Sequence, residues 1–151
     1  GAHLAAGRDV AAVCEGDPFF YGSFMYLYER VADHYPVVTV PGISSLMATA
    51  AASKGPLAAR NDVLSVVPAP LPAEALRCAI DQADCVAIIK LGRHFGKVRE
   101  VLADLGLTGH ARYVAHATMA NESACPLDEV ADDTVPYFSM ILVHKRGAAW
   151  R

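Results

Sequence analysis

The sequence has few of the features that mark secreted or metal-binding proteins. It contains four cysteines, Cys14, Cys78, Cys85 and Cys125, and no Cys-x-x-Cys pair. Cysteines inside apolar runs are usually buried thiols, so we expect all four to be free, as in the reducing cytoplasm. The six histidines show neither His-x-x-x-His nor His-Glu-x-x-His spacing. We therefore expect no metal site.

Other absences narrow the range of partners. The net charge is −3 and there is no long basic run, so nucleic acid is not an expected partner. No apolar run approaches the roughly 20 residues that cross a bilayer, and no signal-peptide pattern is present. We therefore expect a cytoplasmic protein without a membrane partner. With 54% hydrophobic and 19% charged residues, the chain has enough apolar surface for a sizeable core.

Short apolar runs alternate with segments of helical periodicity along the chain. The apolar runs predict strands at residues 9–14, 37–40, 62–67, 84–91, 111–117 and 137–144. Periodicity and capping residues predict helices at residues 23–34, at 73–82, at 94–105 and from Ser44 or Ser45 to Ser53. This alternation favours a layered α/β fold with a largely parallel sheet.

The best domain boundary is the Pro41-Gly42 pair, where a predicted strand ends and a helix begins. Residues 1–40 hold only two predicted strands and little helix, which is too little for a complete α/β domain. Residues 43–151 hold enough predicted elements for an α/β domain of their own. We expect residues 1–40 to be the end of a first domain and residues 43–151 to be the second.

Two glycine-containing segments follow predicted strands. Ligands of open α/β sheets bind outside the carboxyl ends of strands, and the loop Glu15-Gly16-Asp17-Pro18 has that position. Gly16 allows close backbone approach to a ligand, although the residues also suit an ordinary tight turn. The segment Pro41-Gly42-Ile43-Ser44-Ser45 places amides and hydroxyls at a helix start, where they either bind a carboxylate or ribose or simply cap the helix.

A third strand exit is basic. It reads Lys90-Leu91-Gly92-Arg93-His94, with Lys97 and Arg99 nearby. Such charges suit a substrate that carries carboxylates, and they also suit a solvated helix start. His116 and His144 lie in apolar strands, where a histidine is more often part of the core than catalytic.

Together these segments resemble the tetrapyrrole (uroporphyrinogen and precorrin) methyltransferase family. The matching pieces follow one another in the family's order: Gly-Asp-Pro-Phe-Phe-Tyr-Gly at 16–22, Val-Pro-Gly-Ile-Ser-Ser at 40–45, Lys-Leu-Gly-Arg at 90–93, Ala-Thr-Met-Ala at 117–120 and Pro-Tyr-Phe-Ser-Met-Ile-Leu-Val at 136–143. Within the family, the sequence of these motifs most resembles the branch that methylates precorrin-2 at C20, in cobalamin biosynthesis.

The resemblance implies two αβα domains that bind S-adenosylmethionine in the cleft between them. It implies a precorrin-2-like tetrapyrrole as substrate, S-adenosylhomocysteine as product, no required metal and a homodimer. It points to no general base, so the catalytic residues stay unknown. The cofactor contacts that it implies are Glu15, Gly16, Asp17, Phe20, Ser44, Ser45, Leu91 and Ala117. Weaker candidates for binding the substrate carboxylates are Arg93, His94 and Lys97.

One departure from the family affects the expected activity. The family opens with a strand and a Gly-x-Gly-Pro-Gly-Asp-Pro loop, and this sequence has neither. We expect the 151-residue chain alone to bind the cofactor weakly and not to transfer a methyl group. The alternatives are a sibling methyltransferase that acts at another ring carbon, a non-catalytic fragment or binding module, and a nicotinamide-binding Rossmann protein. The absence of Gly-x-Gly-x-x-Gly after any strand disfavours the last of these.

Overall fold

The computed structural model describes residues 1–146. The chain divides into two compact units, one spanning Gly1–Ser45 and the other beginning at Leu46. Among the described residues, none of the helices combines the length and apolarity that crossing a bilayer requires.

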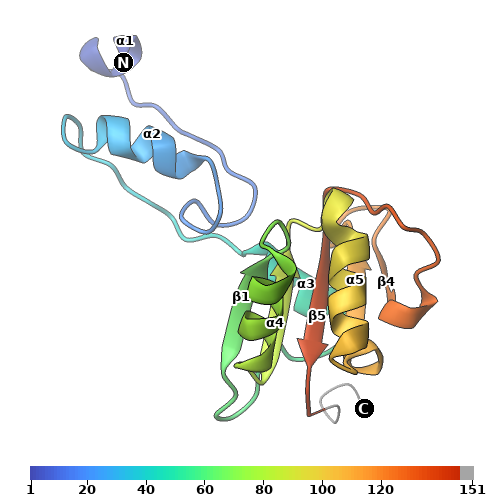
Figure 1. The fold of residues 1–151 in the computed structure, drawn as a ribbon. Helices are drawn as coiled ribbons and strands as arrows, with labels where there is room; N and C mark the ends of the chain where they lie inside the picture. Colours follow the sequence, from blue (N-terminus) through green and yellow to red (C-terminus); the bar gives the residue numbers. More distant parts are fainter. Residues whose placement is uncertain (147–151) are drawn as a thin grey trace. The chain divides into compact units, whose positions relative to one another are not determined.

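The second unit is built on a five-stranded sheet with the strand order β1-β2-β5-β3-β4 (Figure 1). Its strands are β1 (Leu64–Pro68), β2 (Cys85–Ile89), β3 (Ala111–Ala115), β4 (Ser123–Pro126) and β5 (Ser139–His144).

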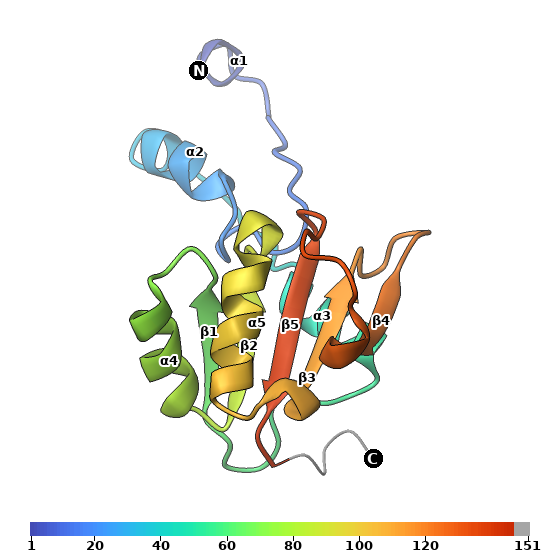
Figure 2. The same cartoon turned by 45° about the vertical axis from the view of Figure 1, so that its right-hand side comes forward.

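The expectation of a largely parallel sheet is wrong. Only the β1–β2 pair of the described sheet is parallel. β5 runs antiparallel to both of its neighbours, β2 and β3, and β4 is antiparallel to β3. β5 lies at the centre of the sheet and runs opposite to β1, β2 and β3 (Figure 2), and β4 returns beside β3 in the reverse direction. An apolar run does not indicate the direction in which its strand runs, so the pattern could not predict this arrangement.

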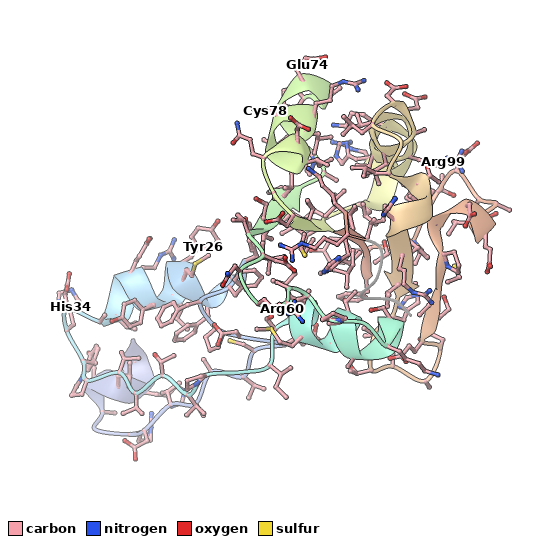
Figure 3. The ribbon with its side chains drawn as sticks, turned by 90° about the horizontal axis from the view of Figure 1, so that it is seen from below. Tyr26, His34, Arg60, Glu74, Cys78 and Arg99 are labelled. Carbon is pink, nitrogen blue, oxygen red and sulfur yellow. The ribbon has the colours of Figure 1, made fainter. Side chains whose placement is uncertain are left out.

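Helices cover both faces of this sheet. α4 (Ala73–Asp81) and α5 (Phe95–Asp104) lie on one face, and α3 (Ser45–Ser53) lies on the other (Figures 1 and 3). α5 buries Phe95, Val98, Val101 and Leu102, a spacing that places one apolar stripe against the sheet. Short 3₁₀ helices form at η1 (Gly92–His94), η2 (Thr108–His110) and η3 (Leu127–Glu129).

A glycine follows the end of α5. Gly106 has a φ of +68°, which a residue without a Cβ adopts readily. Its N–H donates to the carbonyl of Ala103 at 2.9 Å, and the N–H of Leu107 donates to the carbonyl of Leu102 at 2.8 Å. These two bonds form a Schellman motif, which satisfies carbonyls at the helix end and turns the chain toward β3.

The core of the second unit centres on β2. All five of its residues are buried, because helices cover both faces of the sheet and a continuously apolar strand fits such a position. The largest side chains that are almost completely enclosed are Phe95, Leu76, Ile80, Ile88, Leu91, Leu102, Leu127, Ile141, Val86, Val98, Val114 and Val143.

The first unit contains two helices, α1 (Ala2–Ala5) and α2 (Phe24–Val31). Neither helix has a fully buried residue. The rings of Phe19 and Tyr28 meet edge to face, with centroids 5.0 Å apart, and Phe24 packs beside both rings. Ser23 precedes α2 but makes no side-chain capping hydrogen bond.

The strands expected at residues 9–14 and 37–40 do not form. Both segments lack regular secondary structure, and their apolar side chains face solvent, with Val13 96% and Val38 89% exposed. An apolar run becomes a strand only when another strand pairs with its backbone, and within residues 1–146 the sheet pairing involves β1 to β5 alone.

Candidate functional site

Asp17 joins the two glycine-containing segments of the first unit. Its Oδ1 accepts a hydrogen bond from the N–H of Phe19 at 2.9 Å. Its Oδ2 accepts one from the N–H of Gly42, also at 2.9 Å. The first bond is a local turn typical of aspartate, whereas the second spans 25 residues. One half-buried carboxylate therefore fixes the Glu15–Gly22 loop against the turn that follows Pro41.

The contact between the two segments is so close that it requires glycine. A Cβ on Gly42 would lie 2.1 Å from the carbonyl oxygen of Gly16 and 3.2 Å from the Cα of Asp17. Gly16 itself has a φ of +77°, and a Cβ there would lie 3.6 Å from the carbonyl oxygen of Ile43. A side chain at position 42 would push the two segments apart, and one at position 16 would strain the backbone.

The other expected cofactor residues of the first unit surround this contact. Ser44 is buried, and Ser45 is exposed at the start of α3. The first amides of a helix lack intrahelical partners and can bind acceptor groups. Glu15 is exposed, and the ring of half-buried Phe20 stacks edge-on against Tyr21 at 5.0 Å.

Leu91 and Ala117 belong to the second unit, where the sheet topology brings them to one edge. β2 and β3 both run antiparallel to β5, so their carboxyl ends point the same way. Leu91 follows β2, and Ala117 follows β3. The two strands are separated only by β5, which places them about 10 Å apart at the usual strand spacing. Leu91 is completely buried and Ala117 half-buried.

The backbone at this edge is strained at three residues that sequence reasoning did not assign to the site. Lys90, His116 and Thr118 have φ values of +59°, +53° and +69°, which are uncommon for residues with a side chain and concentrate at functional sites. The N–H of His116 donates to the carbonyl of Phe138 at 2.7 Å. The N–H of Thr118 donates to the carboxylate of Glu122 at 2.6 Å. No residue type in these positions signals a positive φ, so the sequence gives no direct cue.

The basic candidates Arg93, His94 and Lys97 lie just beyond β2, on η1 and α5. Nε of Arg93 is 3.5 Å from Nε2 of His94. Desolvation lowers the pKa of His94, and the charges of Lys97 and Arg93 lower it further, so this imidazole is mostly neutral near pH 7. Nζ of Lys97 donates to the carbonyl of Leu71. Arg93 is exposed, whereas His94 and Lys97 are half-buried, and Lys97 already has a backbone partner.

The structure therefore groups the expected residues into two sets. The set around the Asp17 hydrogen bonds lies in the first unit, and the pair at the carboxyl edge of the sheet lies in the second. Four of the eight expected cofactor residues, Gly16, Ser44, Ser45 and Ala117, have small side chains.

Comparison with known proteins identifies one family. The family model described as Tetrapyrrole (Corrin/Porphyrin) Methylases matches residues 1–131. The chain is 43% identical over 142 residues to a precorrin-2 C(20)-methyltransferase of Sinorhizobium sp, covering 94% of this chain and 58% of the relative. It is 33% identical over 147 residues to a cobalt-precorrin-2 C(20)-methyltransferase of Salmonella typhimurium, covering 96% and 62%. The chain thus spans less than two thirds of the length of these relatives.

Solved structures agree on the fold. The methyltransferase CobJ superposes with a TM-score of 0.72 at 21% identity, covering 95% of this chain and 67% of the other. Uroporphyrin-III C-methyl transferase from Thermus thermophilus, complexed with S-adenyl homocysteine, gives a TM-score of 0.61 at 23% identity, covering 86% and 63%.

Proposed function

The chain belongs to the tetrapyrrole (corrin/porphyrin) methylase family, and on this premise we propose that the protein transfers a methyl group from S-adenosylmethionine to C20 of a precorrin-2-like tetrapyrrole. The observation that carries the proposal is the 43% identity over 94% of the chain to a precorrin-2 C(20)-methyltransferase. The relatives are longer, so the proposal concerns the activity of the whole gene product.

The described residues fit S-adenosylmethionine in their chemistry. The cofactor carries a carboxylate, an ammonium group, ribose hydroxyls and an adenine ring, all of which backbone groups can bind. Gly16 and Gly42 are exposed residues that let their two segments pack closely, and Ser44 and Ser45 stand at the start of α3. Ligands of α/β sheets commonly bind outside the carboxyl ends of strands, and Leu91 follows such an end.

Asp17 contributes to this site by holding its backbone in place. Both of its carboxylate oxygens accept backbone N–H groups, so the loop and the turn keep the spacing that a bound cofactor would need. A direct charge pair with the cofactor's ammonium group is the alternative role that the sequence suggests for Asp17. The hydrogen bonds favour the positioning role.

Bound S-adenosylmethionine would supply a methyl group on a positively charged sulfur, which is already activated toward attack by a carbon nucleophile. The protein's part is then to hold both reactants in line and to exclude water, which can lower the barrier by several kcal/mol. Gly16 and Gly42 hold the loop and the turn of the first unit together, and the backbone there would orient the cofactor. Arg93 is the strongest candidate to pair with a substrate carboxylate, because Lys97 already binds the carbonyl of Leu71. We assign no general base.

The proposal is tested by a methyl-transfer assay on the gene product as its genome encodes it. With precorrin-2 and S-adenosylmethionine carrying a ¹³C-labelled methyl group, NMR of the product should show the label on C20. Label on another ring carbon would replace the proposal with that of a sibling methyltransferase. No transfer, together with no heat of binding for S-adenosylhomocysteine in calorimetry, would refute it.

The 151-residue chain provides a second arm of the same experiment. We expect it to bind S-adenosylhomocysteine more weakly than the gene product and to transfer no methyl group, because catalysis needs both reactants held together. Full-strength binding together with turnover by this chain would show that these residues form a complete active site.

A further inference from the structure

A buried polar cluster lies in the second unit, at the opposite end of the strands from Leu91 and Ala117. Cys85 begins β2 and His144 ends β5, and the two are opposite each other in the register. Asp62 lies just before β1. The side chains of Asp62 and His144 are 1% and 3% exposed, and Cys85 is completely buried. Cys85 and Ile89 are the two ends of β2, about 13 Å apart at the usual rise per strand residue, and Leu91 lies beyond the far end.

The distances in this cluster resemble those between the ligands of a tetrahedral metal ion. Oδ2 of Asp62 is 3.4 Å from Nε2 of His144 and 3.6 Å from Sγ of Cys85. The three potential ligand atoms all lie within 4.8 Å of one another. A tetrahedral Zn²⁺ with bonds of about 2.1 Å to oxygen and nitrogen and about 2.3 Å to sulfur requires about 3.4 Å between oxygen and nitrogen and about 3.6 Å between oxygen and sulfur. Two of the three separations therefore already match.

The surroundings orient the carboxylate for this role. Nη2 of Arg146 contacts Oδ1 of Asp62 at 2.5 Å, and the N–H of Ala59 donates to Oδ2 at 2.9 Å. Oδ2 is thereby turned toward the sulfur and the imidazole. Partners of this kind around a ligand set its direction. The side chain of Arg146 is 51% exposed, so the enclosed cluster lies beneath a side chain that reaches solvent.

We propose that Asp62, Cys85 and His144 form a binding site for a divalent cation of the Zn²⁺ type, with solvent in the fourth position. One sulfur, one nitrogen and one oxygen ligand suit a borderline ion such as Zn²⁺ better than Mg²⁺ or Ca²⁺, which prefer oxygen alone. The bound ion would tie the segment before β1 to the ends of β2 and β5. The site is structural and separate from methyl transfer.

The cysteine proton gives the proposal a distinctive signature. Burial, reinforced by the charge of Asp62, raises the pKa of Cys85 to about 11, so without metal the thiol keeps its proton near neutral pH. A metal binds the thiolate, and each ion bound must therefore release a proton. The competing interpretation is a metal-free hydrogen-bonded cluster, in which the S–H and the imidazole simply contact Asp62.

The test uses Co²⁺ as a spectroscopic probe on the gene product after treatment with a chelator and removal of the chelator. We expect one tightly bound Co²⁺ per chain, with a sulfur-to-cobalt charge-transfer band in the near ultraviolet and the strong visible bands of tetrahedral cobalt. Added Zn²⁺ should displace the Co²⁺ and bleach both features. Cys85→Ser should remove the charge-transfer band, whereas Cys78→Ser, at an exposed position on α4 (Figure 3), should retain it.

A second measurement does not depend on whether the variant folds. In weakly buffered solution near pH 7, Zn²⁺ added to the unmodified protein should release about one proton per ion bound and raise the melting temperature. Absence of stoichiometric Co²⁺ and Zn²⁺ binding to the unmodified protein would overturn the proposal. A charge-transfer band that persists in folded Cys85→Ser would also overturn it, because another cysteine would then be the ligand.

Discussion

Removing the carboxylate of Asp17 should weaken cofactor binding by loosening the two segments that it joins. In Asp17→Ala the N–H groups of Phe19 and Gly42 lose their shared acceptor. Hydrogen bonds to a charged acceptor contribute about 1.5–3 kcal/mol each when well shielded, and this half-buried group should contribute less. We take about 1.5–2 kcal/mol for the pair. If that cost appears in binding, affinity for S-adenosylhomocysteine falls about 10- to 30-fold.

The choice of ligand separates positioning from direct contact. Methylthioadenosine has the adenine and ribose of S-adenosylhomocysteine but lacks the amino-acid portion. If Asp17 positions the backbone, calorimetry on the gene product should show Asp17→Ala weakening both ligands by similar factors. If Asp17 pairs with the cofactor's ammonium group, the variant should weaken S-adenosylhomocysteine alone. That second outcome would refute the positioning role.

Two further variants complete the experiment. Gly42→Ala keeps every charge but places a Cβ 2.1 Å from the carbonyl oxygen of Gly16, so it should weaken both ligands at least as much as Asp17→Ala. Asp33→Asn removes an exposed carboxylate of the same unit and should leave both affinities unchanged. Equal binding by Gly42→Ala and the unmodified protein would show that the close approach of the two segments does not matter for the site.

Three other predictions concern stability and protection. Ile88→Ala, at a completely buried position in β2, should lower the free energy of unfolding by about 2–5 kcal/mol in a denaturant melt, whereas Val38→Ala, at an 89% exposed position, should change it by under about 0.5 kcal/mol. In the 151-residue chain, hydrogen exchange should be slow at residues 86–89 and fast at residues 10–13; equal, strong protection would contradict the described pairing. The unfolded thiol ionises near pH 9 and the buried thiol of Cys85 only near pH 11, so metal-free protein should lose stability as pH rises from about 9 to about 11. Cys85→Ser should show a smaller loss, because burial also raises the pKa of Cys125 and of Tyr113.

The apolar pattern of the sequence predicted most strands and helices of the second unit, because the apolar residues that form the pattern are buried in its core. Phe95, Val98, Val101 and Leu102 of α5 are enclosed, and β2 is buried along its length. The same kind of pattern was misleading at residues 9–14 and 37–40, where strands fail for want of pairing. β4 was missed because Ser123–Pro126 is a short edge strand with partly exposed residues. The direction of each strand could not be predicted either, because the apolar pattern of a strand is the same in a parallel and an antiparallel pairing.

The sequence motifs indicated which residues belong to the candidate site, but they did not indicate the role of each residue. The sequence placed Gly16, Asp17 and Gly42 in two loops that follow predicted strands. It did not reveal that Asp17 joins those loops, because a hydrogen bond across 25 residues depends on the fold. The positive φ of His116 and Thr118 was equally hidden, since both residue types occur commonly in ordinary backbone.

The cluster of Asp62, Cys85 and His144 shows the same limit in a different way. Metal-ligand motifs are recognisable when the ligands are close in sequence, whereas these residues come from three separate segments that the sheet brings together. The expectation of no metal site rested only on the sequence spacing of cysteines and histidines. The β2–β5 register places Cys85 opposite His144, so residues far apart in sequence lie close together. The two proposals assign separate tasks to the two ends of the strands, and separate experiments can test them. Chelation should lower stability in the unmodified protein but not in Cys85→Ser, whereas Asp17→Ala should weaken cofactor binding in both the presence and the absence of metal.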